Sequence, residues 1–468
     1  MSTPREPLAD AEPLCRMSAA ELSEGYASGR ISPVEVARAT LARAEAIQPE
    51  LNAFTRIDHD GALAAAEASQ RRWAAKEPLS PVDGVPATIK DIVWIKDQAV
   101  RYGTVAVPAV EADQDAPAVQ RMREAGLVFL GLTTTPEFGW KALTDSPGFG
   151  ITRNPHRPDV TPGGSSGGAA VAAACGAGVF HLGTDGGGSI RIPSTFTGIV
   201  GLKPSFGRVA AYPASPFGTV AHIGPMTRTV ADAKAMLAVM AGPDPRDWYQ
   251  QPGQFPGLHA PAEKVAGLKI GYWSNPPSGS VHPEVAARIE RVVRALEAAG
   301  AVIEPFELPG QDLHAVFQTL WFAGAAARRE MVPAGQRAAH DPGFQEIAEA
   351  GLRIGAADYI RASSARATFG IAMDAALARY DALVSPGAAI PPFTAGLEVP
   401  EGSGLARWTE WAGFSYPINM TQQPAAVIPA GKTDDGRPIG LQIVGARGED
   451  ARVLEIAQSF QEAGVMQG

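Results

Sequence analysis

The sequence has little cysteine, no excess of positive charge and no long apolar run. Cys15 and Cys175 are its only cysteines, too few and too far apart for a disulfide framework or a thiolate metal site. The net charge of −9 excludes the basic face that nucleic-acid binding requires, and it removes the electrostatic attraction to anionic membranes. The longest apolar run, residues 169–180, is too short to span a bilayer. We therefore expect neither a nucleic acid nor a membrane as a partner.

The beginning of the chain also lacks the pattern of a signal peptide. Residues 1–15 contain no basic stretch followed by an apolar core, so we expect a cytoplasmic protein. Hydrophobic residues make up 45% and charged residues 19% of the chain, ordinary values for a globular protein. The length of 468 residues allows two or three domains. We expect one domain over residues 1–468, because the strand-like segment 438–445 needs neighbouring strands.

Strand and helix patterns alternate along the chain. Residues 85–95 and 127–133 are typical of buried strands, and residues 115–126 between them are typical of a helix that ends at Gly126. The same alternation returns later, where an amphipathic helix over 283–299 separates two extended segments. Alternating strands and helices predict an α/β fold with a mostly parallel or mixed sheet.

Four further segments have a recognisable local pattern. The pairs Ser18 with Glu21 and Ser32 with Glu35 each fit a capping box at a helix start. An amphipathic helical pattern runs through residues 343–380, and the proline-rich stretch 242–261 is the best candidate for a linker or surface excursion.

Two loops place serine among glycines, "TPGGSSGGAA" at 161–170 and "GTDGGGSIRIP" at 183–193. Neither has the Lys-Ser/Thr ending of a phosphate-binding loop or a dinucleotide fingerprint. The segment "GGSSG" formally matches the serine-hydrolase elbow G-x-S-x-G, but no downstream histidine lies in a distinctive motif. Sharp turns and helix caps remain an alternative interpretation. Two such loops so close together weaken that alternative.

Acyl-transfer chemistry accounts for both loops. A serine nucleophile needs a base and backbone N–H groups that stabilise the developing oxyanion. In "DGGGS" the amides of Gly186, Gly187, Gly188 and Ser189 can form such an oxyanion hole. The base need not be histidine, because burial lowers the pKa of a lysine and leaves its amine neutral.

Seven segments, taken together and in this order, resemble the amidase signature family. They are "GVPATIKD" (84–91), "TPGGSSGGAA", "GTDGGGSIRIPS", "GIVGLKPSFGRV" (198–209), "GPMTRTVADA" (224–233), "YDALVSP" (380–386) and "PIGLQIVG" (438–445). The resemblance starts near residue 17. Its core motifs lie in residues 17–240 and 380–465, and we expect the more variable 241–379 to contribute to the substrate pocket.

The resemblance implies a fold, a catalytic triad and a reaction. The fold would be a large, mixed, twisted β-sheet covered by helices on both faces. The triad would be Lys90, Ser165 and Ser189, with Ser189 as the nucleophile and Ser165 as the relay of its proton to Lys90. The Gly164–Ser165 peptide bond would be cis. The enzyme would hydrolyse amide-type C–N bonds through an acyl-enzyme, without a metal or a cofactor.

Nearby polar residues have plainer explanations. We expect Asp185 and Arg191 to form a structural pair that shapes the nucleophile turn, and Ser166 to support its loop. Lys203 is expected to be structural, and His181 to be buried with its hydrogen bonds satisfied.

The substrate is less defined than the chemistry. Trp140 and the segments 321–324 and 407–416 supply aromatics that either line a pocket or belong to the core. A pocket of this kind would suit an aryl or alkyl amide, an anilide or a carbamate, as in a urethanase. The alternative within the family is the amidase subunit of a tRNA-dependent amidotransferase complex. The sequence leaves the oligomeric state open, a homodimer included.

Overall fold

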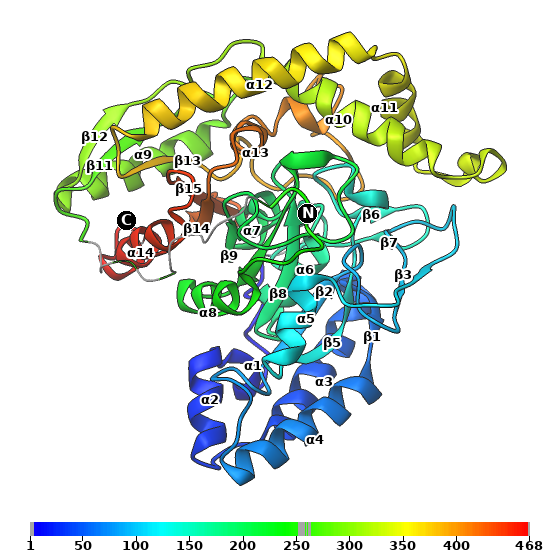
Figure 1. Cartoon of the computed structure of the whole chain (residues 1–468). Helices are drawn as coiled ribbons and strands as arrows, with labels where there is room; N and C mark the ends of the chain where they lie inside the picture. Colours follow the sequence, from blue (N-terminus) through cyan, green and yellow to red (C-terminus); the bar gives the residue numbers. More distant parts are fainter. Residues whose placement is uncertain (1–3, 251–257, 259, 261–263, 467–468) are drawn as a thin grey trace.

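The computed structural model describes residues 4–250, 258, 260 and 264–466 (Figure 1). A central sheet of 11 strands has the order β1-β5-β2-β8-β10-β9-β14-β15-β13-β11-β12. Its strands are β1 (Phe54–Ile57), β2 (Pro86–Lys90), β5 (Val128–Thr133), β8 (Phe180–Asp185), β9 (Val200–Lys203), β10 (His222–Thr227), β11 (Lys269–Tyr272), β12 (Val302–Pro305), β13 (Ala382–Pro386), β14 (Ala425–Lys432) and β15 (Pro438–Val444). Two small hairpins pair β3 (Ala99–Val100) with β4 (Val110–Glu111) and β6 (Asp145–Ser146) with β7 (Gly150–Ile151).

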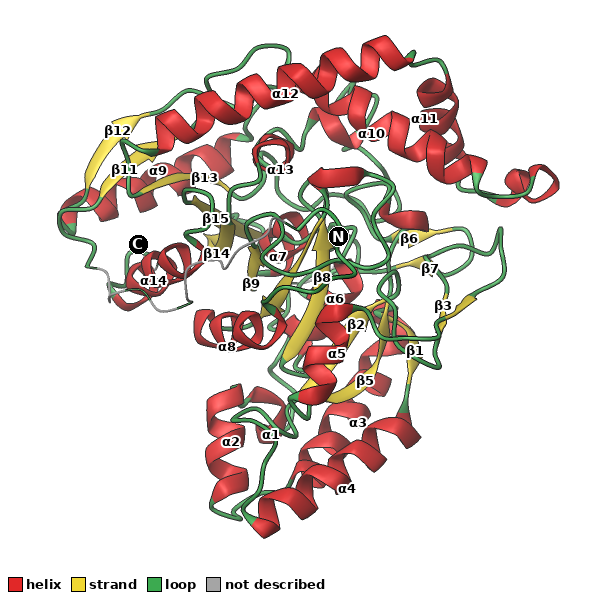
Figure 2. Ribbon diagram, viewed as in Figure 1, coloured by secondary structure: helices red, strands yellow, loops and turns green. Residues whose placement is uncertain are grey.

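Helices flank this sheet, as Figure 2 shows in red around the yellow strands. The α-helices are α1 (Pro13–Arg16), α2 (Ala19–Ala27), α3 (Pro33–Leu51), α4 (His59–Ala75), α5 (Pro117–Glu124), α6 (Gly167–Cys175), α7 (Arg191–Thr197), α8 (Val230–Met240), α9 (Pro283–Ala298), α10 (Leu313–Glu330), α11 (Pro342–Leu352), α12 (Ala356–Leu377), α13 (Tyr416–Thr421) and α14 (Asp450–Glu462). Short 3-10 helices are η1 (Glu137–Gly139), η2 (Gly218–Val220), η3 (Ala334–Ala339) and η4 (Trp408–Glu410).

The sheet is mixed, as predicted. Strand β2 lies between β5 and β8 and is parallel to both, whereas β10 runs antiparallel to β8 and β9. Near the other end, β11 is parallel to β12 and β13. The C-terminal strand β15 lies between β14 and β13 and is antiparallel to both. It therefore has the neighbours on both sides that its apolar sequence requires.

Alternation along the strands separates two hydrophobic cores. In β13, Ala382 and Val384 join the core that includes α5, α8, α9 and α14, while Leu383 joins the core that includes α7 and α10–α13. Successive side chains of a strand point to opposite faces, so these two cores lie on opposite faces of the sheet. Helices therefore cover both faces, as the resemblance implied.

Local patterns near the N-terminus are confirmed. Both capping boxes are present: Ser18 and Ser32 cap α2 and α3, and Glu21 and Glu35 return hydrogen bonds to the cap residues. Helix α5 ends before Gly126, which has a φ of +87° that favours glycine.

Two boundaries differ from the expectation. The strand expected over 85–95 ends at Lys90, because the Lys90 carbonyl accepts the N–H groups of Ile92 and Val93 and turns the chain. The helical segment expected over 343–380 is two helices, α11 and α12, separated at residues 353–355. The proposed surface excursion 242–261 lies partly outside the described residues. Across the described ranges, no helix combines the length and apolarity needed to cross a bilayer.

Candidate active site

Lys90 is the last residue of β2 and is completely buried. Its Nζ lies within hydrogen-bond distance of three hydroxyls: Ser165 Oγ at 2.6 Å, Ser166 Oγ at 2.9 Å and Thr184 Oγ1 at 3.0 Å. Burial lowers the pKa of Lys90 well below its ordinary value of 10.5, against the opposing charge of Asp185. The lowered pKa favours the neutral amine, the form that can accept a proton.

Ser165 lies in a loop that leads into α6. The Gly164–Ser165 peptide bond is cis, as the resemblance implied. A Cβ on Gly164 would lie 2.2 Å from the carbonyl oxygen of Leu143, so no side chain fits there. The N–H of Ser166 donates to the carbonyl of Ser189 at 3.1 Å. This bond ties the two glycine–serine loops together.

Ser189 lies in the turn that follows β8. The turn wraps around the carboxylate of Asp185, which accepts the N–H of Gly188 at 2.8 Å and that of Ile190 at 3.1 Å. The amide of Gly188 is therefore already engaged. The N–H groups of Gly186, Gly187 and Ser189 donate no hydrogen bond to another described residue.

A buried ion pair holds this turn. Arg191 Nε lies 2.9 Å from Asp185 Oδ2, and Arg191 Nη2 lies 3.0 Å from Oδ1, which confirms the predicted structural pair. Arg191 also donates to Gln442 and Asn419, at 2.8 and 2.6 Å. Burial alone would raise the pKa of Asp185, but Arg191 holds that pKa below its usual range. Gln442 lies in the segment 438–445, but neither that segment nor any pattern around Asn419 indicated a contact with Arg191.

Ser165, Thr184 and Ser189 line one cavity of about 440 Å³. Aromatic side chains form much of the wall: Trp94, Tyr102, Phe138, Tyr212, Phe217 and Trp321. The ring of Phe217 stacks on Trp321, with centroids 3.9 Å apart. Ser189 and Ser165 therefore line the same cavity. The Ser189 hydroxyl makes no hydrogen bond within the described part of the chain.

Only part of the expected aromatic wall lines this cavity. Trp321 does so, whereas Trp140, Trp408 and Trp411 belong to the adjoining hydrophobic core. The segment 241–379 contributes Trp321, Arg328 and Met331. The sequence analysis did not predict that aromatic residues of 94–138 and 212–217 line the cavity. These residues lie in loops, which have no regular hydrophobic period from which their positions could be predicted.

The other polar residues considered in the sequence analysis are buried and make hydrogen bonds around the site. Lys203 is buried and donates to the carbonyls of Pro204 and Gln423. His181 is buried and its Nδ1 bonds to Thr88 Oγ1 at 2.8 Å. The prediction for His181 holds only in part, because its Nε2 has no partner in the described portion of the chain. Ser166 supports its loop, as expected, and in addition contacts Lys90.

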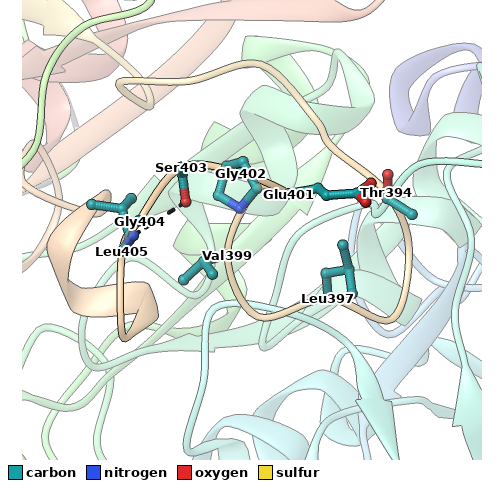
Figure 3. A pocket seen from close by; sticks show the side chains of 9 residues that line it. Thr394, Leu397, Val399, Glu401, Gly402, Ser403, Gly404 and Leu405 are labelled. Carbon is teal, nitrogen blue, oxygen red and sulfur yellow. Dashed lines mark hydrogen bonds between the residues drawn. The ribbon is translucent and has the colours of Figure 1, made fainter.

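Two other features carry no comparable chemistry. Figure 3 shows a hollow lined by residues of the loop 394–405, where the N–H of Leu405 donates to Ser403 Oγ. Of the described residues that line it, only Glu401 has an ionisable side chain, and this residue is exposed. Among the residues that the structure describes, no group of His, Cys, Asp and Glu is arranged to hold a metal ion.

Comparisons with known proteins indicate the family of this chain. The Amidase family model matches residues 35–454. An acylamidase of Rhodococcus erythropolis is 37% identical and covers 95% of each chain. A glutamyl-tRNA(Gln) amidotransferase subunit of Myxococcus xanthus is 34% identical, over 94% of this chain and 96% of its own. The crystal structure of a bacterial aryl acylamidase of the amidase signature enzymes superposes with a TM-score of 0.88, at 30% identity and 97% coverage of both chains.

Proposed function

The chain belongs to the amidase family and is an amidohydrolase that acts on C–N bonds, and from this premise we propose that it hydrolyses aryl and alkyl amides, anilides among them, through an acyl-enzyme on Ser189. The observation that carries this proposal is the buried contact of 2.6 Å between Lys90 Nζ and Ser165 Oγ beside the Ser189 cavity. Carbamates are further candidate substrates, since they present the same carbonyl next to nitrogen.

The hydrogen bonds around Lys90 support a defined direction for the proton relay. Ser166 Oγ donates to the carbonyl of Thr184 at 3.1 Å, so its oxygen is left to accept from Lys90. A neutral amine has two N–H groups and one lone pair. If the N–H groups point to Ser166 and Thr184, the lone pair points to Ser165, which is the nearest of the three hydroxyls.

In the first half of the reaction Ser189 Oγ attacks the amide carbonyl and forms a tetrahedral oxyanion. The proton of Ser189 passes to Ser165, whose own proton passes to Lys90. The free N–H groups of Gly186, Gly187 and Ser189 would stabilise the oxyanion, because backbone donors fixed in advance cost no reorganisation during the reaction. The amide of Gly188 holds Asp185 instead.

In the second half the C–N bond breaks and the leaving nitrogen takes a proton back from Lys90 through Ser165. The amine departs and leaves an ester on Ser189. A water molecule then attacks the ester and gives its proton to Lys90 through Ser165. As the ester bond breaks, Lys90 returns this proton through Ser165 to Ser189 Oγ, and the carboxylic acid is released. Lys90 is then neutral again, so one amide and one water yield one amine and one acid.

Replacement of Ser189 by alanine tests this assignment. We expect Ser189→Ala to lower the turnover of 4-nitroacetanilide by about 10⁴-fold or more, as loss of a serine nucleophile does elsewhere, and to abolish covalent labelling by a phosphonylating probe. Ser403→Ala is the matched control, since Ser403 is exposed on the loop 394–405, and it should keep both activities. Undiminished labelling of the Ser189→Ala protein would refute the assignment.

A second candidate function is the amidase subunit of a tRNA-dependent amidotransferase. The 34% identity to the Myxococcus xanthus protein supports it. Such a subunit works within a complex and transfers ammonia, whereas an acylamidase acts alone. Hydrolysis of an anilide by the isolated chain would favour the free-standing hydrolase. Turnover of glutamine that appears only with partner subunits would favour the alternative.

A further inference from the structure

Arg328 is a positively charged residue of the cavity wall. It lies in the last turn of α10 and lines the same cavity as Ser189. Its guanidinium carbon lies 4.3 Å from the ring centroid of Phe138 and 4.9 Å from that of Tyr102. It donates a hydrogen bond to the sulfur of Met331, at 3.9 Å. Within residues 4–250 and 264–466, no carboxylate forms an ion pair with it.

Glu137, the carboxylate whose charge acts on Arg328, is already occupied. Glu137 Oε1 accepts from Thr104 and from His340 Nδ1, and Glu137 Oε2 accepts the N–H of Asp341 at 2.7 Å. Burial lowers the pKa of the Arg328 guanidinium, and the charge of Glu137 opposes that shift without a hydrogen bond.

The aromatic contacts leave the donors of Arg328 available. A ring stabilises a guanidinium charge through its π face but offers no conventional hydrogen-bond acceptor. Tyr102 is itself fixed, because its hydroxyl accepts from Trp94 Nε1 at 2.6 Å. A guanidinium carries five N–H donors in a planar fork that matches a carboxylate. Apart from the contact with Met331, the guanidinium of Arg328 therefore has donors that no described residue accepts, and it lies against two aromatic rings.

The rest of the cavity wall does not neutralise this charge. Among the described residues of the lining, Asp185 is the one acidic side chain, and it is paired with Arg191. Burial lowers the pKa of His222, which favours the neutral imidazole. The wall thus combines apolar rings with one positive charge that no carboxylate of the wall pairs with.

We propose that Arg328 is a specificity-determining residue that binds a carboxylate carried by the substrate, apart from the amide that Ser189 attacks. The inference rests on the proposed function and deepens it by naming the substrate class, amides that bear a negative charge. The carboxylate can belong to the acyl part, as in the monoanilide of a dicarboxylic acid, or to the amine part, as in an N-acylaminobenzoate. The two arrangements share the same recognition chemistry.

Two matched substrate pairs test the proposal. The first pair is the mono-4-nitroanilide of glutaric acid and its neutral primary amide, and the second is 4-acetamidobenzoate and 4-acetamidobenzamide. We expect the intact protein to favour the anionic member of at least one pair by roughly 10- to 100-fold in kcat/KM, the range of a charge-assisted hydrogen bond. The pair that shows the preference identifies which part of the substrate carries the carboxylate.

Arg328→Met should abolish this preference, mainly through KM, and leave the neutral substrates within about threefold. Arg328→Lys should restore part of it. Arg329→Met is the matched control, because Arg329 is adjacent on α10 but pairs with Glu330 and Glu349 rather than lining the cavity. Equal kcat/KM for both members of both pairs, or equal effects of the two methionine variants, would overturn the proposal.

Failure of the proposed function would look different. If the intact protein hydrolysed none of the four amides, the acylamidase function would fail and this inference with it. If neutral and anionic amides were hydrolysed equally well, the function would stand and only the role of Arg328 would be refuted. Calorimetric titration of the Ser189→Ala protein with the first pair gives a readout without turnover, in which tighter binding of the carboxylate is expected.

Discussion

Lys90 shows how one buried side chain couples chemistry to stability. Its hydrogen-bond partners are three hydroxyls, which can orient an amine but cannot neutralise an ammonium. Burial therefore lowers its pKa. The lowered pKa that would make Lys90 a base also lowers the free energy of unfolding as the pH falls. The reason is that an unfolded lysine binds a proton that the folded one does not.

Replacement of Lys90 by methionine should separate these two effects. Between the folded and the unfolded pKa of Lys90, the unfolded chain holds one more proton, so falling pH destabilises the intact protein by about 1.4 kcal/mol per pH unit. Lys90→Met lacks this proton uptake. We expect the variant to lose amide hydrolysis and to gain stability relative to the intact protein as the pH falls, measured by urea unfolding at several pH values.

The control for this experiment is Lys264→Met, which removes an exposed lysine. It should retain activity, and its unfolding free energy should follow that of the intact protein across the same pH range. A Lys90→Met protein whose stability stays parallel to that of the intact protein would contradict a lowered pKa of Lys90. A Lys90→Met protein that still hydrolyses anilides would contradict its role as the base.

The turn after β8 depends on elements that are distant in the sequence. The carboxylate of Asp185 organises the amides of the turn, and Arg191 neutralises that carboxylate. Asn419 of α13 and Gln442 of β15 complete the arrangement. The position of Ser189 therefore depends on α13 and β15 as well as on its own glycine-rich loop.

Asp185→Asn should be strongly destabilising, because it leaves the buried Arg191 without its counter-charge. Breaking a buried pair by removing one partner costs about 3–5 kcal/mol. The double variant Asp185→Asn/Arg191→Met removes both charges and should recover much of this loss in urea unfolding. It should not recover anilide turnover, since a neutral asparagine cannot accept the turn amides with both side-chain ends.

A pair exposed at both partners provides the matched comparison. Glu50 lies 2.7 Å from Arg5, and the two side chains are 51% and 49% exposed. Glu50→Gln should therefore cost about 1 kcal/mol or less. If Asp185→Asn cost no more than Glu50→Gln, the ion pair would not be what holds the turn.

The candidate site residues that the sequence predicted lie in short contiguous motifs. Lys90, Ser165 and Ser189 each lie in a motif of fewer than fifteen residues, and the pair Asp185–Arg191 lies within one turn. The contacts of Asn419 and Gln442 with Arg191 could not be predicted in this way, although Gln442 lies in the segment 438–445, because each reaches Arg191 from more than 200 residues away. Such contacts depend on the order of strands in the sheet, and no local period encodes that order.

The same reasoning explains the errors in the elements. The run Ile92-Val93-Trp94-Ile95 continues the apolar character of β2, so composition alone extends the strand. The backbone turns after Lys90 because Ile92 and Val93 donate to its carbonyl. Trp94 is thereby placed in the cavity wall rather than in the sheet. Likewise Trp408 and Trp411 pack in the core. Aromatic content alone does not predict whether such a residue packs in the core or lines the cavity.

The order of strands in the central sheet places strands from the first half of the chain beside strands from its C-terminal part. Strand β9 pairs with β14, so residues 201–203 are hydrogen-bonded neighbours of residues 425–427. The segment 241–379 adds β11 and β12 to one edge of the same sheet. Because a strand edge without its partner exposes unpaired backbone groups, we propose that residues 1–468 fold as one cooperative unit.

Division of the chain at residue 240 tests this proposal. Residues 1–240 contain β9 but not its partner β14, so the fragment alone should show no cooperative thermal transition and should aggregate. Co-expression of 1–240 with 241–468 is the control, because it restores the partner strand without restoring the covalent link, and it should recover folded protein and anilide turnover. A cooperative transition of residues 1–240 alone would show instead that this part is an independent domain, because its β9 edge would then need no partner.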